Sequence, residues 1–509
     1  MTDKAVELKK TVPVVDEVDV LVVGAGIAGS TAAVTAAREG AKTMIVDRFG
    51  YPGGNMGPGL IGGAPNLELP ESMRRNGMPG IPGEFIRRCE SLCNAPLLSN
   101  YFRDSQVISY VWLKMMQETG VKFMFNTYAG DPIMEGNRVT GLFVENKNGT
   151  QAILAKVVID ATGDADVAAR AGAPIDEGKS LFHAGMYFAM ANVDIEKYWK
   201  EVWHTWTPPN PEECFAEPHK FIHPHEEISF TPDPEDLRWA ESIDRSIKKP
   251  HPSVVRMAKS PYIGPFFPYY RAAWKAGEYK FLQEIDGIGW VYCDHGIFRS
   301  VSGVQYIPDP LRIGRYGIVG ALVGVWRNEN PTSGDTKIMT AIEVKCRTFI
   351  FETAQFLNRW VPGFEKAYLH IIAPYFHARG GRSIISERPV TMDDIKECRK
   401  FDDVVFQVPY PNPHRDSEET YDFPYRQFLP RKVDGLLVTG RACIIQPPVM
   451  RARWMVFLMG QATGVAAALS AREGKMPRDL NVKELQRVLY HKYQMPLGDI
   501  KRLRELEII

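Results

Sequence analysis

The sequence has few cysteines, and their spacing matches neither a metal site nor a redox pair. Seven are scattered along 509 residues, and no two of them form a Cys-X-X-Cys motif. The closest two, Cys89 and Cys93, are four residues apart, and we interpret them as core residues rather than as redox or metal-binding groups. The odd number and wide spacing predict reduced thiols, no metal site and a cytoplasmic location.

The sequence also lacks an excess of charge and a long apolar run. Lys+Arg and Asp+Glu number 61 each, so the formal net charge is zero. Nucleic acids favour a basic excess in their partners, and we expect no nucleic-acid partner. The charged start of the chain has no apolar region behind it, unlike a signal peptide. Residues 318–326, one of the longest apolar stretches, are too few for a bilayer span of about 20 residues, so we expect no membrane span.

A glycine-rich turn near the amino end stands between a predicted strand and a predicted helix. The apolar residues 18–23 form a buried strand in this interpretation, and Gly24-Ala25-Gly26-Ile27-Ala28-Gly29 follows it directly. Residues 30–38 are rich in alanine and predict a helix, and residues 42–46 predict a second strand that ends at Asp47. This order is the fingerprint of a dinucleotide-binding Rossmann unit.

Each residue of this fingerprint has a physical task. Gly24 permits the tight turn, Gly26 lets backbone N–H groups approach a pyrophosphate, and Gly29 lets helix and strand pack closely. The carboxylate of Asp47 suits the two hydroxyls of an adenosine ribose and would repel a 2′-phosphate. The pattern therefore predicts a site for FAD or NAD and argues against NADP.

A second glycine-rich loop, Pro52-Gly53-Gly54-Asn55-Met56-Gly57, follows the ribose-binding strand. An NAD dehydrogenase does not usually need a loop here, whereas FAD needs protein contacts that direct it towards the position of its isoalloxazine ring. An unrelated surface turn is the alternative. We interpret the loop as favouring FAD.

At these residues the chain resembles the FAD-dependent oxidoreductases of the glutathione-reductase-like fold, which are distantly related to fumarate reductase flavoproteins. Three further stretches carry the resemblance: residues 156–174 with Asp160-Ala161-Thr162-Gly163-Asp164, residues 379–385, and residues 433–468 with Arg451. In the second of these, Arg379 and Arg382 match the outer arginines of the family's Arg-Glu-Ser-Arg-Arg-Ile. Gly380, Gly381 and Ser383 depart from it, which leaves the roles of the middle positions open.

The resemblance implies an α/β fold with a discontinuous Rossmann-like FAD-binding domain and an inserted α+β substrate domain. We place the two parts of the FAD domain at residues 1–176 and 390–475, and the inserted domain, dense in aromatics and proline, at 177–389. Residues 476–509 form a terminal helical segment. The length alone also favours more than one domain.

The resemblance further implies which residues contact FAD. Residues 460–464 are expected to offer backbone N–H groups to the flavin; the alternative is a tight packing seam between a helix and the sheet, and both could hold. The predicted cofactor-binding residues are Gly24, Gly26, Gly29, Asp47, Arg48, Gly54, Asn55, Ala129, Gly163, Asp164, Gly440, Arg441, Gly460, Gln461 and Gly464.

Candidate catalytic residues lie where the two domains are expected to meet. The guanidinium groups of Arg379, Arg382 and Arg451 could pair with a substrate carboxylate or stabilise reduced flavin, and surface solvation is the alternative. His377 could act as a general acid or base, and a packed core histidine is the alternative.

Three functions follow from this set of features. The first is a dehydrogenase or reductase that transfers hydride between a small-molecule substrate and the flavin; the alternatives are a flavin monooxygenase and an electron-transfer subunit. No second Gly-X-Gly-X-X-Gly stands in a strand–helix context, and no Cys-X4-Cys motif follows the first, so the electron donor or acceptor is left open. A homo-oligomer is compatible with these features.

Overall fold

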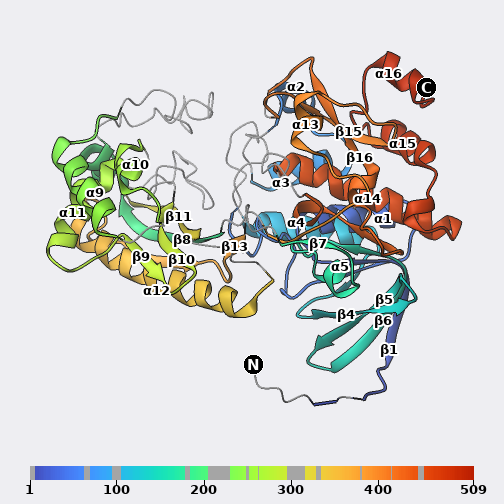
Figure 1. The fold of residues 1–509 in the computed structure, drawn as a ribbon, viewed down its shortest axis with the longest axis horizontal. Helices are drawn as coiled ribbons and strands as arrows, with labels where there is room; N and C mark the ends of the chain where they lie inside the picture. Colours follow the sequence, from blue (N-terminus) through green and yellow to red (C-terminus); the bar gives the residue numbers. More distant parts are fainter. Residues whose placement is uncertain are drawn as a thin grey trace.

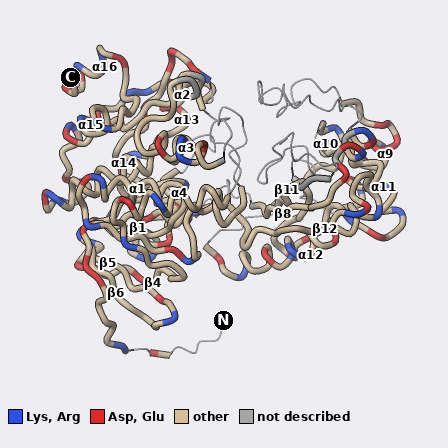
Figure 2. The backbone as a smooth tube through the Cα atoms, turned by 180° about the vertical axis from the view of Figure 1, so that it is seen from behind, with Lys and Arg blue, Asp and Glu red and all other residues tan. Residues whose placement is uncertain are grey.

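The chain folds into two lobes, each with its own hydrophobic core (Figure 1). The computed structural model describes the chain except residues 1–5, 8, 62–68, 94–104, 178–183, 204–229, 248–250, 262, 295–315, 328–333, 379–380, 414 and 445–451. Lys and Arg alternate with Asp and Glu over both lobes, as the zero net charge requires (Figure 2).

The first lobe is built on a seven-stranded sheet. Its order is β3 (Lys122–Met124), β2 (Thr43–Val46), β1 (Val14–Val23), β6 (Gly149–Asp160), β5 (Arg138–Asn146) and β4 (Tyr128–Glu135), and β17 (Leu436–Val438) pairs with β6. The pairs β2–β3, β1–β2, β1–β6 and β6–β17 are parallel, and β4–β5–β6 is an antiparallel meander. The two strands predicted at residues 18–23 and 42–46 are therefore confirmed as β1 and β2.

Helices from both the amino-terminal and the carboxyl-terminal parts of the chain pack in this lobe. They are α1 (Ile27–Arg38), α3 (Gly80–Cys93), α4 (Ser105–Glu118) and α14 (Arg453–Glu473). The rings of Phe85 and Trp112 stack at 4.1 Å, and Phe457 of α14 packs 5.6 Å from Phe85. By length and composition α14 could cross a membrane, but 94% of its apolar window is buried inside the protein, as in a core helix.

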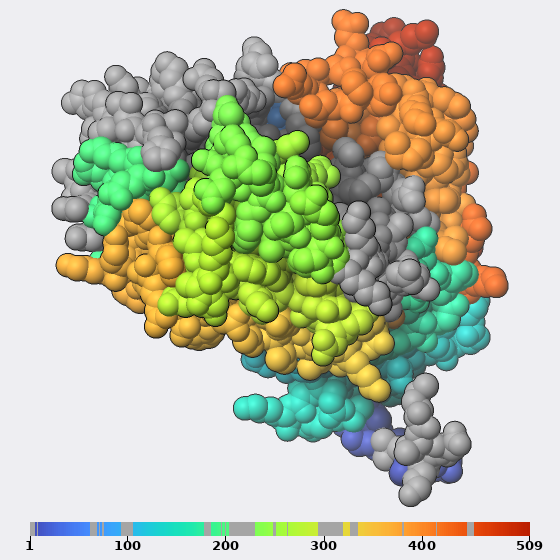
Figure 3. Space-filling view, turned by 60° about the vertical axis from the view of Figure 1, so that its left-hand side comes forward, coloured from blue at the N-terminus to red at the C-terminus, as the bar shows by residue number. Residues whose placement is uncertain are grey.

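The second lobe is an antiparallel sheet flanked by helices. The strands run β12 (Tyr368–Ile372), β8 (Ala184–Asp194), β11 (Tyr316–Arg327), β10 (Gly289–Asp294) and β9 (Leu282–Ile285), and β13 (His377–Ala378) also pairs with β8. The helices α9 (Pro234–Ser246), α10 (Val254–Lys259) and α11 (Phe267–Lys275), green in Figure 3, lie above the yellow-orange α12 (Thr336–Trp360).

Aromatic side chains fill the core of the second lobe. Tyr270 stacks on Phe281 at 4.8 Å and on Phe356 at 5.2 Å, and Tyr279 stacks on Phe356 at 4.5 Å. All four residues are buried. Core packing thus accounts for these aromatic residues of the inserted segment.

Near the predicted domain boundaries, each core contains a residue from the part of the chain that was assigned to the other domain. Ile384 of β14 (Ser383–Ile384) lies in the first core, and β14 pairs with β7 (Ile175–Asp176). The first core therefore takes up the chain before residue 389, the predicted end of the insertion. Conversely, Leu60 from the amino-terminal part is buried in the core of the second lobe.

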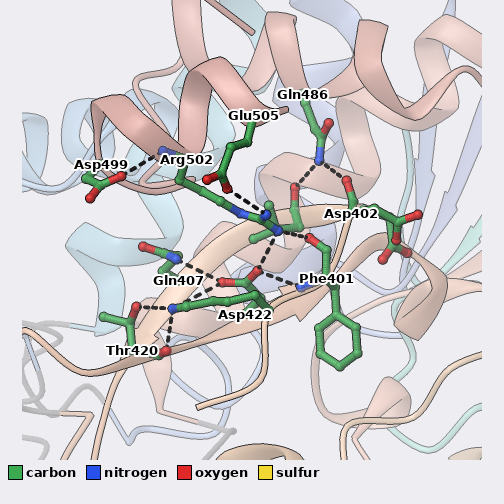
Figure 4. Close-up of polar contacts among 12 residues, drawn as sticks. Phe401, Asp402, Gln407, Thr420, Asp422, Gln486, Asp499, Arg502 and Glu505 are labelled. Carbon is green, nitrogen blue, oxygen red and sulfur yellow. Dashed lines mark hydrogen bonds and ion pairs between the residues drawn. The ribbon is translucent and has the colours of Figure 1, made fainter. Parts of the chain in front are cut away.

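The end of the chain is tied to the hairpin of β15 (Val404–Pro409) and β16 (Thr420–Pro424) by a buried carboxylate (Figure 4). Asp422 accepts hydrogen bonds from the backbone N–H of Phe401 at 2.8 Å and from Gln407 Nε2 at 2.9 Å. Arg502 of α16 (Ile500–Glu505) lies 3.6 Å from the same carboxylate and donates to the Phe401 carbonyl. The predicted terminal helix appears as α15 (Val482–His491), with α16 as an additional helix.

Candidate functional site

The candidate site lies at the carboxyl ends of the parallel strands. Val23 at the end of β1 pairs in register with Val46 of β2 and Asp160 of β6, and Val438 of β17 also pairs with Asp160. The turns that follow these four strands therefore share one edge of the sheet. This edge is where ligands bind in open α/β sheets.

Two glycine-rich loops meet at this edge. Gly24 has a φ of +103°, and the backbone N–H of Gly53 donates to the Ala25 carbonyl at 2.7 Å. A Cβ on Gly54, whose φ is +52°, would lie 2.7 Å from the Gly26 Cα. A Cβ on Gly29 would meet the Gly24 carbonyl oxygen. The structure thus brings the two predicted loops together, with backbone against backbone.

The amino terminus of α1 is suited to bind an anion. Its N-cap is Gly26, and no side chain among the described residues caps it, whereas Asp233 caps α9 and Asp335 caps α12. A Cβ on Gly26 would meet nothing closer than the Gly54 Cα at 4.0 Å, so space remains above this residue. Uncapped N–H groups and the helix dipole together favour a phosphate group at this position.

Asp47 lies beside this helix terminus at the end of β2. Its carboxylate accepts hydrogen bonds from the N–H groups of Ala25 at 2.5 Å and Phe49 at 2.7 Å. Burial raises the pKa of Asp47, and these two hydrogen bonds counteract that shift. Because a carboxylate has about four acceptor positions, two remain for the hydroxyls of a ribose.

Asp160 organises the turn after β6. One of its oxygens accepts from the N–H and hydroxyl groups of Thr162 at 3.0 and 2.7 Å, and the other accepts from the N–H groups of Val167 and Ala168. Burial raises the pKa of Asp160 to about 6, against the effect of these hydrogen bonds. The side chain therefore fixes the path of residues 160–168, which include Gly163 and Asp164.

An ion pair joins this turn to the turn after β17. Nη2 of Arg441 lies 2.8 Å from a carboxylate oxygen of Asp164, and a Cβ on Gly163 would lie 3.4 Å from the same guanidinium nitrogen. A Cβ on Gly440 would lie 3.0 Å from the Ala28 side chain in α1. Predicted cofactor residues from distant parts of the sequence are thereby brought together.

Two further predicted cofactor-binding residues, Arg48 and Ala129, lie near the ends of β2 and β4. The guanidinium of Arg48 lies over the rings of Phe49 and Tyr375, at 4.8 and 5.1 Å from their centroids. The Ala129 carbonyl accepts a hydrogen bond from Arg170 at 2.6 Å, at the start of β4. Tyr375 belongs to the second lobe, so this side of the site is made by both lobes.

The predicted catalytic residues have different surroundings. Arg382 forms an ion pair with Asp166, and a Cβ on Gly334 would lie 2.9 Å from its side chain. Burial and the neighbouring Asp164 raise the pKa of Asp166, and Arg382 opposes this shift. His377 is buried in β13, where a Cβ on Gly185 would lie 3.3 Å from its ring, as expected of a packed histidine. Arg379 and Arg451 lie outside the described residues.

The expectation that residues 460–464 offer free backbone N–H groups is wrong. They lie in the interior of α14, which begins at Arg453, so their N–H groups belong to the helix. A Cβ on Gly460 would lie 2.3 Å from the Ala28 carbonyl oxygen, and a Cβ on Gly464 would lie 2.6 Å from that of Ala32.

These two glycines therefore let α14 pack closely against the helix α1, whereas the alternative interpretation placed this packing against the sheet. Gln461 is buried and accepts a hydrogen bond from the Ile81 N–H at 2.8 Å. The uncapped N–H groups of α14 are those of its first turn, after Ala452. The contact of these three residues with the cofactor stays a prediction.

A family described as FAD dependent oxidoreductase matches residues 19–280 and 308–489, most of the chain. The chain belongs to this family. The uncapped helix terminus, the loops around Gly26 and the free acceptor positions of Asp47 fit FAD. When bound, FAD supplies the redox chemistry, and the protein supplies binding, orientation and electrostatics.

Similarity to individual proteins is more distant. The thiamine thiazole synthase of Methanococcus vannielii is 30% identical over 165 residues, which cover 30% of this chain and only 58% of that protein. A geranylgeranyl bacteriochlorophyll reductase-like protein from Thermoplasma acidophilum has 13% identity and a TM-score of 0.37, over 94% of this chain and 84% of its own. A variant of halogenase PltM in complex with FAD has 14% identity and a TM-score of 0.39, over 93% and 73%.

Sequence reasoning missed the residues that bring the two lobes of this flavoprotein to the site. Tyr375 donates a hydrogen bond to Asn55, and Asp166 pairs with Arg382. The hydroxyl of Ser109 in α4 donates a hydrogen bond to the Pro52 carbonyl at 2.7 Å and so fixes the start of the second glycine-rich loop. Asp166 stood within a stretch that carries the resemblance, whereas nothing around Tyr375 or Ser109 in the sequence indicated a role.

Proposed function

We propose that the protein is a dehydrogenase or reductase that transfers hydride between a small-molecule substrate and its flavin. The observation that supports this most directly is that the second lobe contacts the first at the FAD-binding edge. Leu60, Tyr375 and Arg382 all lie at this junction. A small molecule held at the junction would lie beside the cofactor.

The residues around the junction can orient an acidic or polar substrate. Arg382 is largely enclosed between Asp166 and the backbone of Gly334, so its guanidinium is fixed in position. One carboxylate oxygen of Asp166 takes no part in the ion pair, and the Asp166 side chain is 41% exposed. A fixed cation with a partly exposed carboxylate beside it can select a substrate by charge and direction.

Anaerobic photometry of the full-length, FAD-loaded protein tests the proposal. A panel of hydroxy acids, amines, alcohols and enoates is screened, with dithionite as the chemical donor. We expect one substrate class to bleach or restore the flavin band near its oxidised maximum, reversibly and without oxygen. Arg382→Met should weaken that response, whereas Arg359→Met, on the exposed end of α12, should not.

Two outcomes would contradict the proposal. If the reduced flavin reacts only under air and leaves an oxygenated product, the protein is a monooxygenase. If the flavin is reduced only by a copurifying polypeptide, the protein is an electron-transfer subunit.

A further inference from the structure

The loop of residues 53–61 connects the FAD-binding edge to the core of the second lobe. At its beginning, Gly53 donates to the Ala25 carbonyl, and Gly54 lies against Gly26. At its end, Leu60 is 5% exposed and packs in the second core. Within the loop, the Ile61 N–H donates to the Asn55 carbonyl at 2.8 Å. A shift of the second lobe would therefore be transmitted to the turn at Gly26.

Tyr375 holds the middle of this loop from the second lobe. Its hydroxyl donates a hydrogen bond to Asn55 Oδ1 at 2.9 Å. Its ring lies 4.7 Å from that of Phe49, which follows the Asp47–Arg48 pair. The Arg48 guanidinium lies 5.1 Å from the ring of Tyr375, within the range of a cation–π contact. One side chain thus touches both the second glycine-rich loop and the residues that follow the ribose-binding strand.

Tyr375 comes from the connection between β12 and β13, and both strands pair with β8 in the second lobe. Its backbone is therefore positioned by the second sheet rather than by the FAD-binding lobe. Asn55 itself lies in a turn rather than in a strand, and its exposed side chain accepts the hydrogen bond from Tyr375.

We propose that Tyr375 is a positioning residue through which the second lobe sets the affinity for FAD. By fixing Asn55, it holds Gly54 against Gly26 and keeps the space above the α1 terminus at the width that the pyrophosphate requires. Binding of FAD and docking of the second lobe then stabilise each other, since both use the same loop. This inference rests on FAD binding and is independent of which substrate the flavin oxidises or reduces.

Titration of the full-length apoprotein with FAD, followed by flavin fluorescence, tests the role of Tyr375. Tyr375→Phe removes one hydrogen bond and keeps the ring. We expect the Kd for FAD to rise about two- to tenfold, the range for one net hydrogen bond. The matched control is Tyr279→Phe, which removes the 2.7 Å hydrogen bond with Thr353 inside the core of the same lobe. This control should lower the thermal midpoint and leave the Kd unchanged.

An unchanged Kd in Tyr375→Phe would overturn the inference, and so would an equal rise in both variants, since a general loosening of the lobe would then explain it. Should Tyr375→Phe not fold, Leu60→Ala takes its place, because it loosens the far end of the same loop. A negative result leaves the proposed hydride transfer untouched, since that is judged from flavin reduction rather than from FAD affinity.

Discussion

Arg441 and Asp164 form an ion pair of 2.8 Å that connects the turn after β17 with the turn after β6. Both side chains are only about one-fifth exposed, so the ion pair is largely enclosed by the protein. Its position at the carboxyl edge of the sheet indicates that it orders the turns that face the cofactor.

Arg441→Met should therefore weaken FAD binding, whereas breaking an ion pair away from this edge should not. We expect the Kd for FAD to rise about tenfold, equivalent to roughly 1.4 kcal/mol, because a charge-assisted contact is lost at the site. Fluorescence titration measures the Kd, and urea unfolding of the apoprotein measures stability. Arg388→Met is the control, since it breaks an ion pair of the same 2.8 Å length away from this edge. Equal Kd values for the two variants would refute a role for Arg441 at the site.

Gly54→Ala, compared with a control glycine of similar φ, tests whether the loop at Gly54 binds the cofactor. The new Cβ would lie 2.7 Å from the Gly26 Cα, at a residue with φ of +52°. We expect FAD binding to be lost and the free energy of unfolding to fall by about 1–2 kcal/mol from the left-handed conformation alone.

Gly136→Ala is the matched control for this change. Gly136 has φ of +62° in the turn between β4 and β5, and a Cβ there would meet nothing within 4 Å. It should show the same loss of stability in urea unfolding with normal FAD affinity. If Gly54→Ala binds FAD as tightly as Gly136→Ala does, the two loops do not form the cradle.

The strand–turn–helix of residues 18–47 was predictable because its signals are local, although the structure begins the first strand at Val14. An apolar run, a glycine turn and an alanine-rich stretch each occupy a few consecutive residues, and the residue types of each stretch indicate its element. The turns after β6 and β17 came instead from the resemblance, since glycine and acidic residues alone occur in many turns.

The junction between the lobes was not predictable from local patterns. Tyr375 and Asn55 are 320 residues apart in the sequence, and Arg382 and Asp166 are 216 apart. Such contacts depend on how two finished lobes pack, and no periodicity within either segment encodes them. The place of Gly460 and Gly464 was ambiguous for a related reason, because glycine serves both close helix packing and close approach to a ligand.

The stability of the first lobe should fall in acid partly through Asp394. Burial alone would raise the pKa of this carboxyl, but hydrogen bonds from Thr391 and Arg388 lower it on balance. A lowered folded-state pKa means that the stabilisation is present above the unfolded value near 3.8 and is lost as the pH falls through the folded value.

Asp394→Asn should accordingly be less stable than the wild type at pH 7, by about 1–3 kcal/mol, with the gap starting to close only as the pH falls below 3.8. Urea unfolding at a series of pH values measures this gap. Asp393→Asn, on the exposed side of the same short helix α13 (Met392–Lys396), should differ little from the wild type at any pH. A gap for Asp394→Asn that widens in acid would show that the carboxyl is not held ionised by its partners.

Arg502 should anchor the end of the chain without affecting the cofactor. It lies 3.6 Å from the fully buried Asp422 and donates to the Phe401 carbonyl at 2.8 Å (Figure 4). Arg502→Met removes one of two cations near a buried carboxylate, the other being Lys400 at 3.7 Å. We expect the free energy of unfolding to fall by about 2–3 kcal/mol, because part of the compensation for burying that charge is lost.

Arg504→Met, two residues further on the exposed face of α16, is the matched control and should change stability by less than about 0.5 kcal/mol. Both variants should bind FAD with the wild-type Kd, since no contact of Arg502 reaches the carboxyl edge of the first sheet among the described residues. If Arg502→Met loses FAD while its urea midpoint stays at that of Arg504→Met, the carboxyl-terminal segment acts on the cofactor site directly rather than through the stability of the lobe.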